Sequence, residues 1–124
     1  MTIKDIMQND FIPLKATDTV EDALKIMTDN KVNGLPVVND DNLLVGMVVK
    51  ADIYRFLIQP GHYKVSPIDW VMAKKVISAP PDETVSAAAK KLLDHHIIAM
   101  PVVVEGKVLG MISIEDLLKY YSQA

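Results

Sequence analysis

The sequence contains one series of motifs twice, in the same order, and this duplication restricts the possible folds more than any other feature. The matching pairs are IKDIM (3–7) with PIDWVM (67–72), DTVEDALKIM (18–27) with ETVSAAAKKL (83–92), GLPVVND (34–40) with AMPVVVE (99–105), and LLVGMVVKAD (43–52) with KVLGMISIED (107–116). An internal repeat of this kind indicates two copies of one structural unit. We therefore expect a first repeat at residues 1–60 and a second at residues 61–124, which together form one compact module.

Each repeat contains the pattern of a helix followed by a β-hairpin. Apolar residues at the i, i+3, i+4 and i+7 positions of an amphipathic helix start at Val20 in the first repeat and at Val85 in the second. Thr19 and Thr84 precede these helices and suit the N-cap position. The segment LPVVNDDNLLVGMVV (35–49) has two β-branched runs around a polar turn, which predicts a hairpin.

A second helix and a short first strand complete the predicted repeat. In the second repeat the helix is indicated by a stripe of four apolar residues: Ile114, Leu117, Leu118 and Tyr121. Short strands are expected before the first helices, at FIPL (11–14) and VISA (76–79). The predicted fold class is therefore α+β, with two tandem β-α-β-β-α repeats. Neither repeat can bury its apolar faces alone, so we expect the repeats to pack sheet to sheet about a pseudo-twofold axis.

Composition excludes several classes of function. The formal net charge is −3 and the basic residues do not cluster, which disfavours nucleic-acid binding. The absence of cysteine excludes disulfides and thiolate chemistry, and suits a reducing compartment. No apolar run approaches the roughly 20 residues that span a bilayer. We expect a cytoplasmic protein without membrane association.

The segment SIED (113–116) at the start of the last helix has two interpretations. As a capping box, the Ser113 hydroxyl accepts a hydrogen bond from the helix backbone and the Asp116 carboxylate reaches back to the cap. As a binding site, the helix N-terminus favours an anion such as phosphate, and the carboxylate accepts hydrogen bonds from a vicinal diol such as ribose. Gly110, on the preceding strand, would leave room for a flat group. The tetrapeptide alone favours capping.

Other polar clusters suggest no chemistry. His95 and His96 are adjacent, so on a helix they point about 100° apart and suit a surface better than one metal ion. The segment NDDN (39–42) lacks calcium-loop spacing and is better explained as a hairpin turn. We find no nucleophile–base pair, metal triad or phosphate loop, so we expect neither an enzyme nor a metal site. Trp70 is equally compatible with a contact surface and with burial.

The order of these motifs resembles a known family. The tandem of T-V-x-x-A, h-P-V-V and G-h-h-[ST]-x-x-D, where h is apolar, is similar to a pair of CBS domains, the modules named after cystathionine β-synthase, and the resemblance covers residues 3–121. It implies two quasi-equivalent clefts between the repeats. Such clefts bind adenosine ligands, among them AMP, ADP, ATP and S-adenosylmethionine, and regulate a partner protein.

The resemblance also implies roles for individual residues. In the main cleft Asp116 would hold the ribose hydroxyls and Ser113 would face the ribose or phosphate. The adenine would be held by Phe11 and Ile12 together with the turn Asn33, Gly34 and Leu35. The weaker cleft would consist of Asp52, Val49, Ile77, Ile98, Ala99 and Met100. Val49 replaces the hydroxyl there, and the positions before each h-P lack the basic residues of phosphate-gripping members.

We therefore expect a regulatory module that binds an adenosine ligand such as AMP or ATP as effector and needs no cofactor. The alternative is a ligand-free structural module that mediates protein–protein interaction. The second helices, near 51–58 and 115–121, carry apolar residues on more than one face, which predicts a homodimer with C2 symmetry. The sequence leaves open the ligand, the regulated partner and whether the chain is part of a larger protein.

Overall fold

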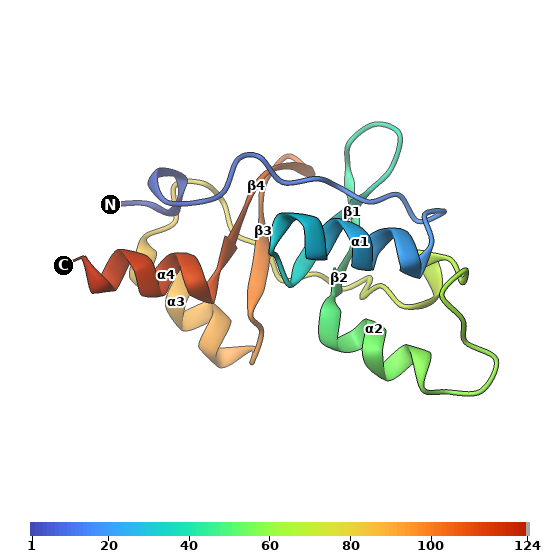
Figure 1. Cartoon of the computed structure of the whole chain (residues 1–124). Coiled ribbons are helices and arrows are strands. Elements are labelled where there is room, and N and C mark those ends of the chain that lie inside the picture. Colours follow the sequence, from blue (N-terminus) through green and yellow to red (C-terminus); the bar gives the residue numbers. More distant parts are fainter. Residues whose placement is uncertain (124) are drawn as a thin grey trace. The chain divides into compact units, whose positions relative to one another are not determined.

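The computed structural model describes residues 1–123 and divides into two compact units (Figure 1). Unit 1 joins Met1–Phe11 to the part of the chain from Ile77 onward, and unit 2 is Ile12–Val76. The units therefore differ from the two sequence repeats: the first residues of the chain pack with the second repeat. The repeat boundaries at 1–60 and 61–124 stay a prediction about the duplication.

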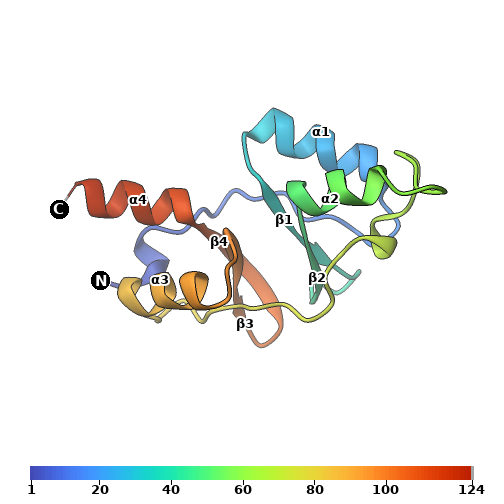
Figure 2. The same cartoon turned by 90° about the horizontal axis from the view of Figure 1, so that it is seen from below.

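Unit 2 is a β-hairpin with two helices on one face (Figure 2). Its strands β1 (Gly34–Val38) and β2 (Leu44–Val49) are antiparallel, and the register pairs Gly34 with Val49. Helix α1 (Val20–Asn30) precedes the hairpin and α2 (Lys50–Leu57) follows it directly. A short 3-10 helix, η2 (Ile68–Trp70), lies later in the chain. The core contains Leu14, Val20, Ala23, Met27, Leu35, Val37, Val48, Ile53, Phe56 and Ile68.

Unit 1 repeats this arrangement. Strands β3 (Ala99–Val104) and β4 (Lys107–Ser113) form the antiparallel hairpin, and α3 (Val85–Asp94) and α4 (Ile114–Ser122) lie on one face of it (Figures 1 and 2). The 3-10 helix η1 (Ile3–Asp5) comes from the N-terminal segment. The core contains Ile3, Ala79, Val85, Ala88, Leu92, Met100, Val102, Ile112 and Leu117.

The N-caps predicted for the first helices are confirmed. Thr19 Oγ1 accepts a hydrogen bond from the Asp22 backbone N–H at 3.1 Å, and Thr84 Oγ1 accepts one from Ala87 at 3.2 Å. These hydroxyls pair backbone donors that the first helical turn leaves free. The hairpins and the mixed α/β fold are confirmed as well.

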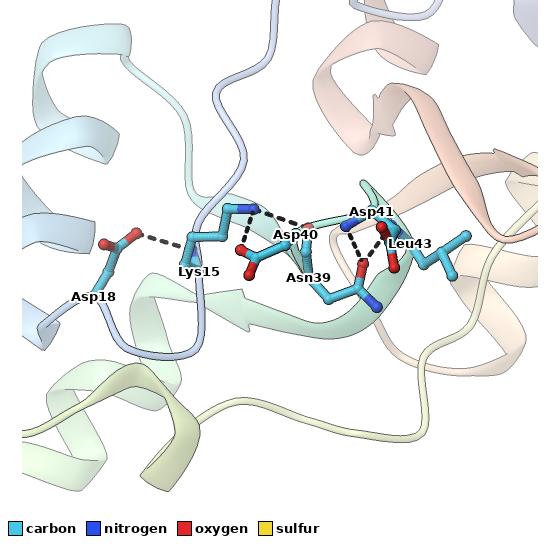
Figure 3. A network of polar contacts seen from close by, with 6 residues as sticks. All are labelled: Lys15, Asp18, Asn39, Asp40, Asp41 and Leu43. Carbon is cyan, nitrogen blue, oxygen red and sulfur yellow. Dashed lines mark hydrogen bonds and ion pairs between the residues drawn. The ribbon is translucent and has the colours of Figure 1, made fainter.

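The segment NDDN lies in the turn of the first hairpin, as predicted (Figure 3). Asn39 Oδ1 accepts hydrogen bonds from the backbone N–H groups of Asp41 and Leu43 at 2.9 and 3.0 Å. Lys15 Nζ donates to the Asn39 backbone carbonyl at 2.8 Å (Figure 3). An asparagine that bonds to the backbone shortly after it is a typical turn device, so this polar cluster stabilises the hairpin.

The short strands expected at residues 11–14 and 76–79 are reduced to single bridges. Leu14 pairs with Val37, and Ala79 pairs with Val102, both in parallel orientation. Pro13 precedes the first bridge and Pro80 follows the second. Because proline has no N–H to donate, a ladder cannot continue through these positions.

The helix predicted from the apolar stripe at residues 114–121 is confirmed as α4, but only part of the stripe faces the core. Leu117 is buried, whereas Ile114, Leu118 and Tyr121 are exposed. The helix begins immediately after β4, and this junction directs Leu117 and the partly buried Tyr120 toward the core. Three of the four residues of the stripe are therefore exposed.

Candidate functional site

The junction between β4 and α4 positions the carboxylate of Asp116, which is buried. Asp116 Oδ2 accepts hydrogen bonds from the Ser113 backbone N–H at 2.9 Å and from the Ser113 hydroxyl at 3.0 Å. The Asp116 N–H donates in turn to Ser113 Oγ at 3.2 Å. The expected capping box is therefore present. Asp116 is only 8% exposed, so its carboxylate is held in one orientation.

A third donor reaches this carboxylate from the N-terminal segment. Gln8 Nε2 donates to Asp116 Oδ1 at 3.2 Å, across 108 positions of sequence. The backbone of Gln8 is fixed beside β4, because its N–H donates to the Met111 carbonyl at 2.9 Å and its carbonyl accepts from Met111 at 3.0 Å. Gln8 is not among the residues predicted for this site. The signal was the recurring prefix, which places Ala73 at the equivalent position of the second copy.

The space at Gly110 is filled by the chain itself. A Cβ at this position would lie 2.7 Å from the backbone carbonyl oxygen of Gln8 and 2.8 Å from the sulfur of Met7. Gly46, the equivalent residue in unit 2, is approached in the same way by Met72 and Ala73. The expectation that Gly110 leaves room for a flat ligand is therefore wrong: the glycines admit the segments that follow the two 3-10 helices.

The equivalent junction in unit 2 has a different set of contacts. Val49 is the residue before α2 and offers no side-chain hydrogen bond to the helix. Asp52 forms an ion pair with Arg55, and its side chain is 37% exposed. Ala73 lies beside Met47 through two backbone hydrogen bonds of 2.9 Å, as Gln8 lies beside Met111, but alanine has no side-chain amide that could donate to Asp52. The two carboxylates therefore have different neighbours.

The turns before β1 and β3 lie beside these junctions. Ala99 pairs with Ser113 in the strand register, and the Ile98 carbonyl accepts a hydrogen bond from Ile114 at 2.9 Å. In unit 2 the Asn33 carbonyl accepts one from Lys50 at 2.8 Å. Each junction is thus next to the turn of its own repeat.

The residues predicted for each cleft are divided between the units. For the main cleft, Ser113, Asp116 and Phe11 belong to unit 1, whereas Ile12, Asn33, Gly34 and Leu35 belong to unit 2. For the weaker cleft, Val49 and Asp52 belong to unit 2, and Ile77, Ile98, Ala99 and Met100 belong to unit 1. Their assembly into two sites stays a prediction.

Burial separates these residues into two groups. Leu35 and Met100 are core residues and are almost fully buried. Ile12, Asn33 and Ile98 are exposed. Within residues 1–123, no group of three histidine, cysteine or acidic side chains could hold a metal ion. Over the same residues, none of the helices has the length and apolar character needed to cross a membrane.

A family model described as CBS domain matches the chain twice, at residues 3–59 and 65–123. Two solved structures extend this match to the fold. The CBS domain pair of protein MJ0100, solved with 5′-methylthioadenosine and S-adenosyl-L-methionine, has a TM-score of 0.91 at 29% identity and covers 99% of this chain and 97% of its own. CBSX2 in complex with AMP has a TM-score of 0.87 at 26% identity, with 98% and 96% covered.

Sequence relatives include larger proteins. A protein of Methanosalsum zhilinae named homoserine O-acetyltransferase is 34% identical over 120 residues, which are 96% of this chain but 24% of the relative. Other curated relatives with this name show similar coverage. The chain thus spans about a quarter of the length of these relatives.

Proposed function

This chain belongs to the CBS domain family as a tandem pair, and from that premise we propose that it is a regulatory module that senses an adenosine-containing ligand such as AMP, ATP or S-adenosylmethionine. Relatives of the same fold were solved with ligands of this class. The relatives named homoserine O-acetyltransferase are about four times as long as the segment that this chain matches. We therefore assign a regulatory role, and no catalytic role, to the CBS pair.

The buried carboxylate of Asp116 carries the proposal. A carboxylate offers about four acceptor positions, and the three donors from Ser113 and Gln8 occupy three of them. One position, on Oδ1, remains for a ligand hydroxyl. In this proposal Asp116 accepts from the ribose, and Ser113 orients the carboxylate. Phe11 and the exposed Ile12 and Asn33 stay predicted contacts of the adenine.

The alternative is a ligand-free interaction module. It is favoured by the capping box, because the hydrogen bonds between Ser113 and Asp116 stabilise the start of α4 whether or not a ligand binds. The exposed apolar residues Leu118 and Tyr121 on the same helix also suit a protein–protein contact.

Two aspartates with the same capping role separate these functions. Asp22 occupies the third position of α1 in a capping box with Thr19, as Asp116 does in α4 with Ser113. Loss of either carboxylate should lower the unfolding free energy, because each accepts a hydrogen bond from the backbone N–H of its cap residue. Thermal unfolding is measured for wild type, Asp116→Ala and Asp22→Ala, each with AMP, ATP or S-adenosylmethionine.

A ligand at 100 times its Kd stabilises the native state by about 2.7 kcal/mol. We expect this stabilisation in wild type and Asp22→Ala, and its loss in Asp116→Ala. Full stabilisation of Asp116→Ala would show that the ligand does not use this carboxylate. If none of the three ligands stabilises wild type, the ligand-free module is supported.

A further inference from the structure

The acceptor positions of Asp116 limit how a ligand with two hydroxyls can bind. Both positions on Oδ2 are taken by Ser113, through its backbone N–H at 2.9 Å and its hydroxyl at 3.0 Å. On Oδ1, one is taken by Gln8 at 3.2 Å. A vicinal diol brings two O–H donors, and Asp116 has one free acceptor position for them.

Gln8 is the donor that can leave. The two bonds from Ser113 form the cap of α4, and losing them would free the start of the helix. The bond from Gln8 is the longest of the three, and only a flexible side chain makes it. The Gln8 backbone stays paired with Met111, so its amide can move away without shifting the segment.

We propose that Gln8 is a specificity-determining residue of the Ser113–Asp116 site. Its amide occupies the acceptor that the second hydroxyl of a diol ligand requires, and the diol displaces it on binding. This inference rests on the proposed function, since it concerns the same ribose acceptor. Gln8 therefore weakens the binding of a diol and has little effect on a ligand with a single hydroxyl, which the free acceptor position already accommodates.

The experiment compares AMP with 2′-deoxy-AMP by calorimetry. Gln8→Met keeps the length of the side chain and removes the amide. Asn9→Ala changes an exposed neighbour in the same segment and serves as the control. We expect Gln8→Met to bind AMP about tenfold more tightly, because a hydrogen bond to a charged group no longer has to be displaced. Binding of 2′-deoxy-AMP should change less than about twofold, and Asn9→Ala should match wild type for both ligands.

A second measurement observes the displacement itself. The side-chain amide signals of Gln8 in a 15N NMR spectrum are identified by their loss in Gln8→Met. On saturation with AMP they should move toward the position of a solvent-exposed glutamine, and 2′-deoxy-AMP should leave them in place. If Gln8→Met fails to fold, Gln8→Ala replaces it in the binding comparison and in the assignment.

The outcomes separate this inference from the proposed function. If Asp116→Ala abolishes AMP binding while Gln8→Met binds AMP as wild type does or more weakly, the proposed function stands and the role of Gln8 is wrong. Equal tightening for AMP and 2′-deoxy-AMP would also overturn it. If neither wild type nor Gln8→Met binds AMP, the inference about Gln8 fails, and the proposed function fails as well if ATP and S-adenosylmethionine also leave wild type unstabilised.

Discussion

The backbone carbonyl oxygen of Gln8 lies 2.7 Å from the point where a Cβ of Gly110 would stand. A contact below 3.0 Å with a backbone atom requires the chain to shift. At the equivalent Gly46 the nearest obstacle is the sulfur of Met72, which belongs to a flexible side chain, and the carbonyl of Ala73 is farther away at 3.1 Å. A side chain at position 110 should therefore disturb the fold more than one at position 46.

We expect Gly110→Ala to lower the unfolding free energy by about 2 kcal/mol, within the usual range for overpacking. Gly46→Ala should cost less, because Met72 can change its rotamer. Urea unfolding of both variants measures the difference. A larger loss for Gly46→Ala than for Gly110→Ala would contradict this ranking.

The ion pair between Lys91 and Glu83 should be important for the stability of unit 1. Lys91 Nζ lies 2.9 Å from Glu83 Oε1 and also donates to the Ser78 carbonyl at 3.0 Å. Glu83 Oε2 is buried and has no hydrogen-bond partner within residues 1–123. Lys91→Met would leave a largely buried carboxylate uncompensated, which should cost on the order of 3 kcal/mol in urea unfolding. The double variant with Glu83→Gln should regain part of this loss; an additive loss would show that the residues act independently.

The two proposed ligand sites should be unequal. Asp116 keeps the Ser113 hydroxyl, whereas Val49 supplies none and a ligand at Asp52 must compete with Arg55. We expect calorimetry to show one tight site per chain, with the second about 10- to 100-fold weaker. Asp116→Ala should remove the tight site and Asp52→Ala should leave it. Two equal sites, or a tight site that depends on Asp52, would reverse the assignment.

Val49→Thr tests the missing hydroxyl directly. Thr at this position before α2 can cap the helix, which should raise the unfolding free energy by about 1 kcal/mol. It should also strengthen the weaker site in calorimetry. A gain in stability without a gain in affinity would show that the hydroxyl serves capping alone.

The capping box of α1 should give the stability a defined pH dependence. The hydrogen bond from the Thr19 backbone N–H, and next that from its hydroxyl, lower the pKa of Asp22 in the folded state. A lowered pKa means that the charged form stabilises the fold above the unfolded-state pKa and that this contribution is lost as the pH falls through the folded-state pKa. Asp22→Asn should therefore be less stable than wild type at pH 7, and the two urea midpoints should converge in acid. A constant difference would exclude the charge as its source.

The homodimer predicted from the sequence can be tested on α2 and α4. Leu118 is 64% exposed and Ile58 is 83% exposed, whereas Ile53 and Phe56 are buried in the core. We expect light scattering to give the dimer mass for wild type and the monomer mass for Leu118→Glu. Leu93→Glu, at an exposed leucine on α3, is the matched control and should stay dimeric. A monomeric wild type at tens of micromolar would contradict the prediction.

The duplication, the hairpins, the threonine N-caps and the Ser113–Asp116 capping box could all be predicted from the amino-acid sequence. These features depend on residues close together in the chain, where residue type and spacing decide the local hydrogen bonds. Which face of α4 packs on the core could not be predicted in this way. The residues Ile114, Leu118 and Tyr121 have helical periodicity but are exposed.

The neighbours of Gly110 and Asp116, in contrast, follow from the folding of distant segments against each other. Residues 1–11 pack with the second repeat, which brings Gln8 to a carboxylate 108 positions away and closes the space above the glycine. The repeated prefix identifies this segment in the sequence but does not show which repeat it packs against. In the structure Ile3 is fully buried in the core formed by α3, β3, β4 and α4. Such long-range packing has no periodic signature in the sequence, because contacts between distant segments depend on the shape of the folded core.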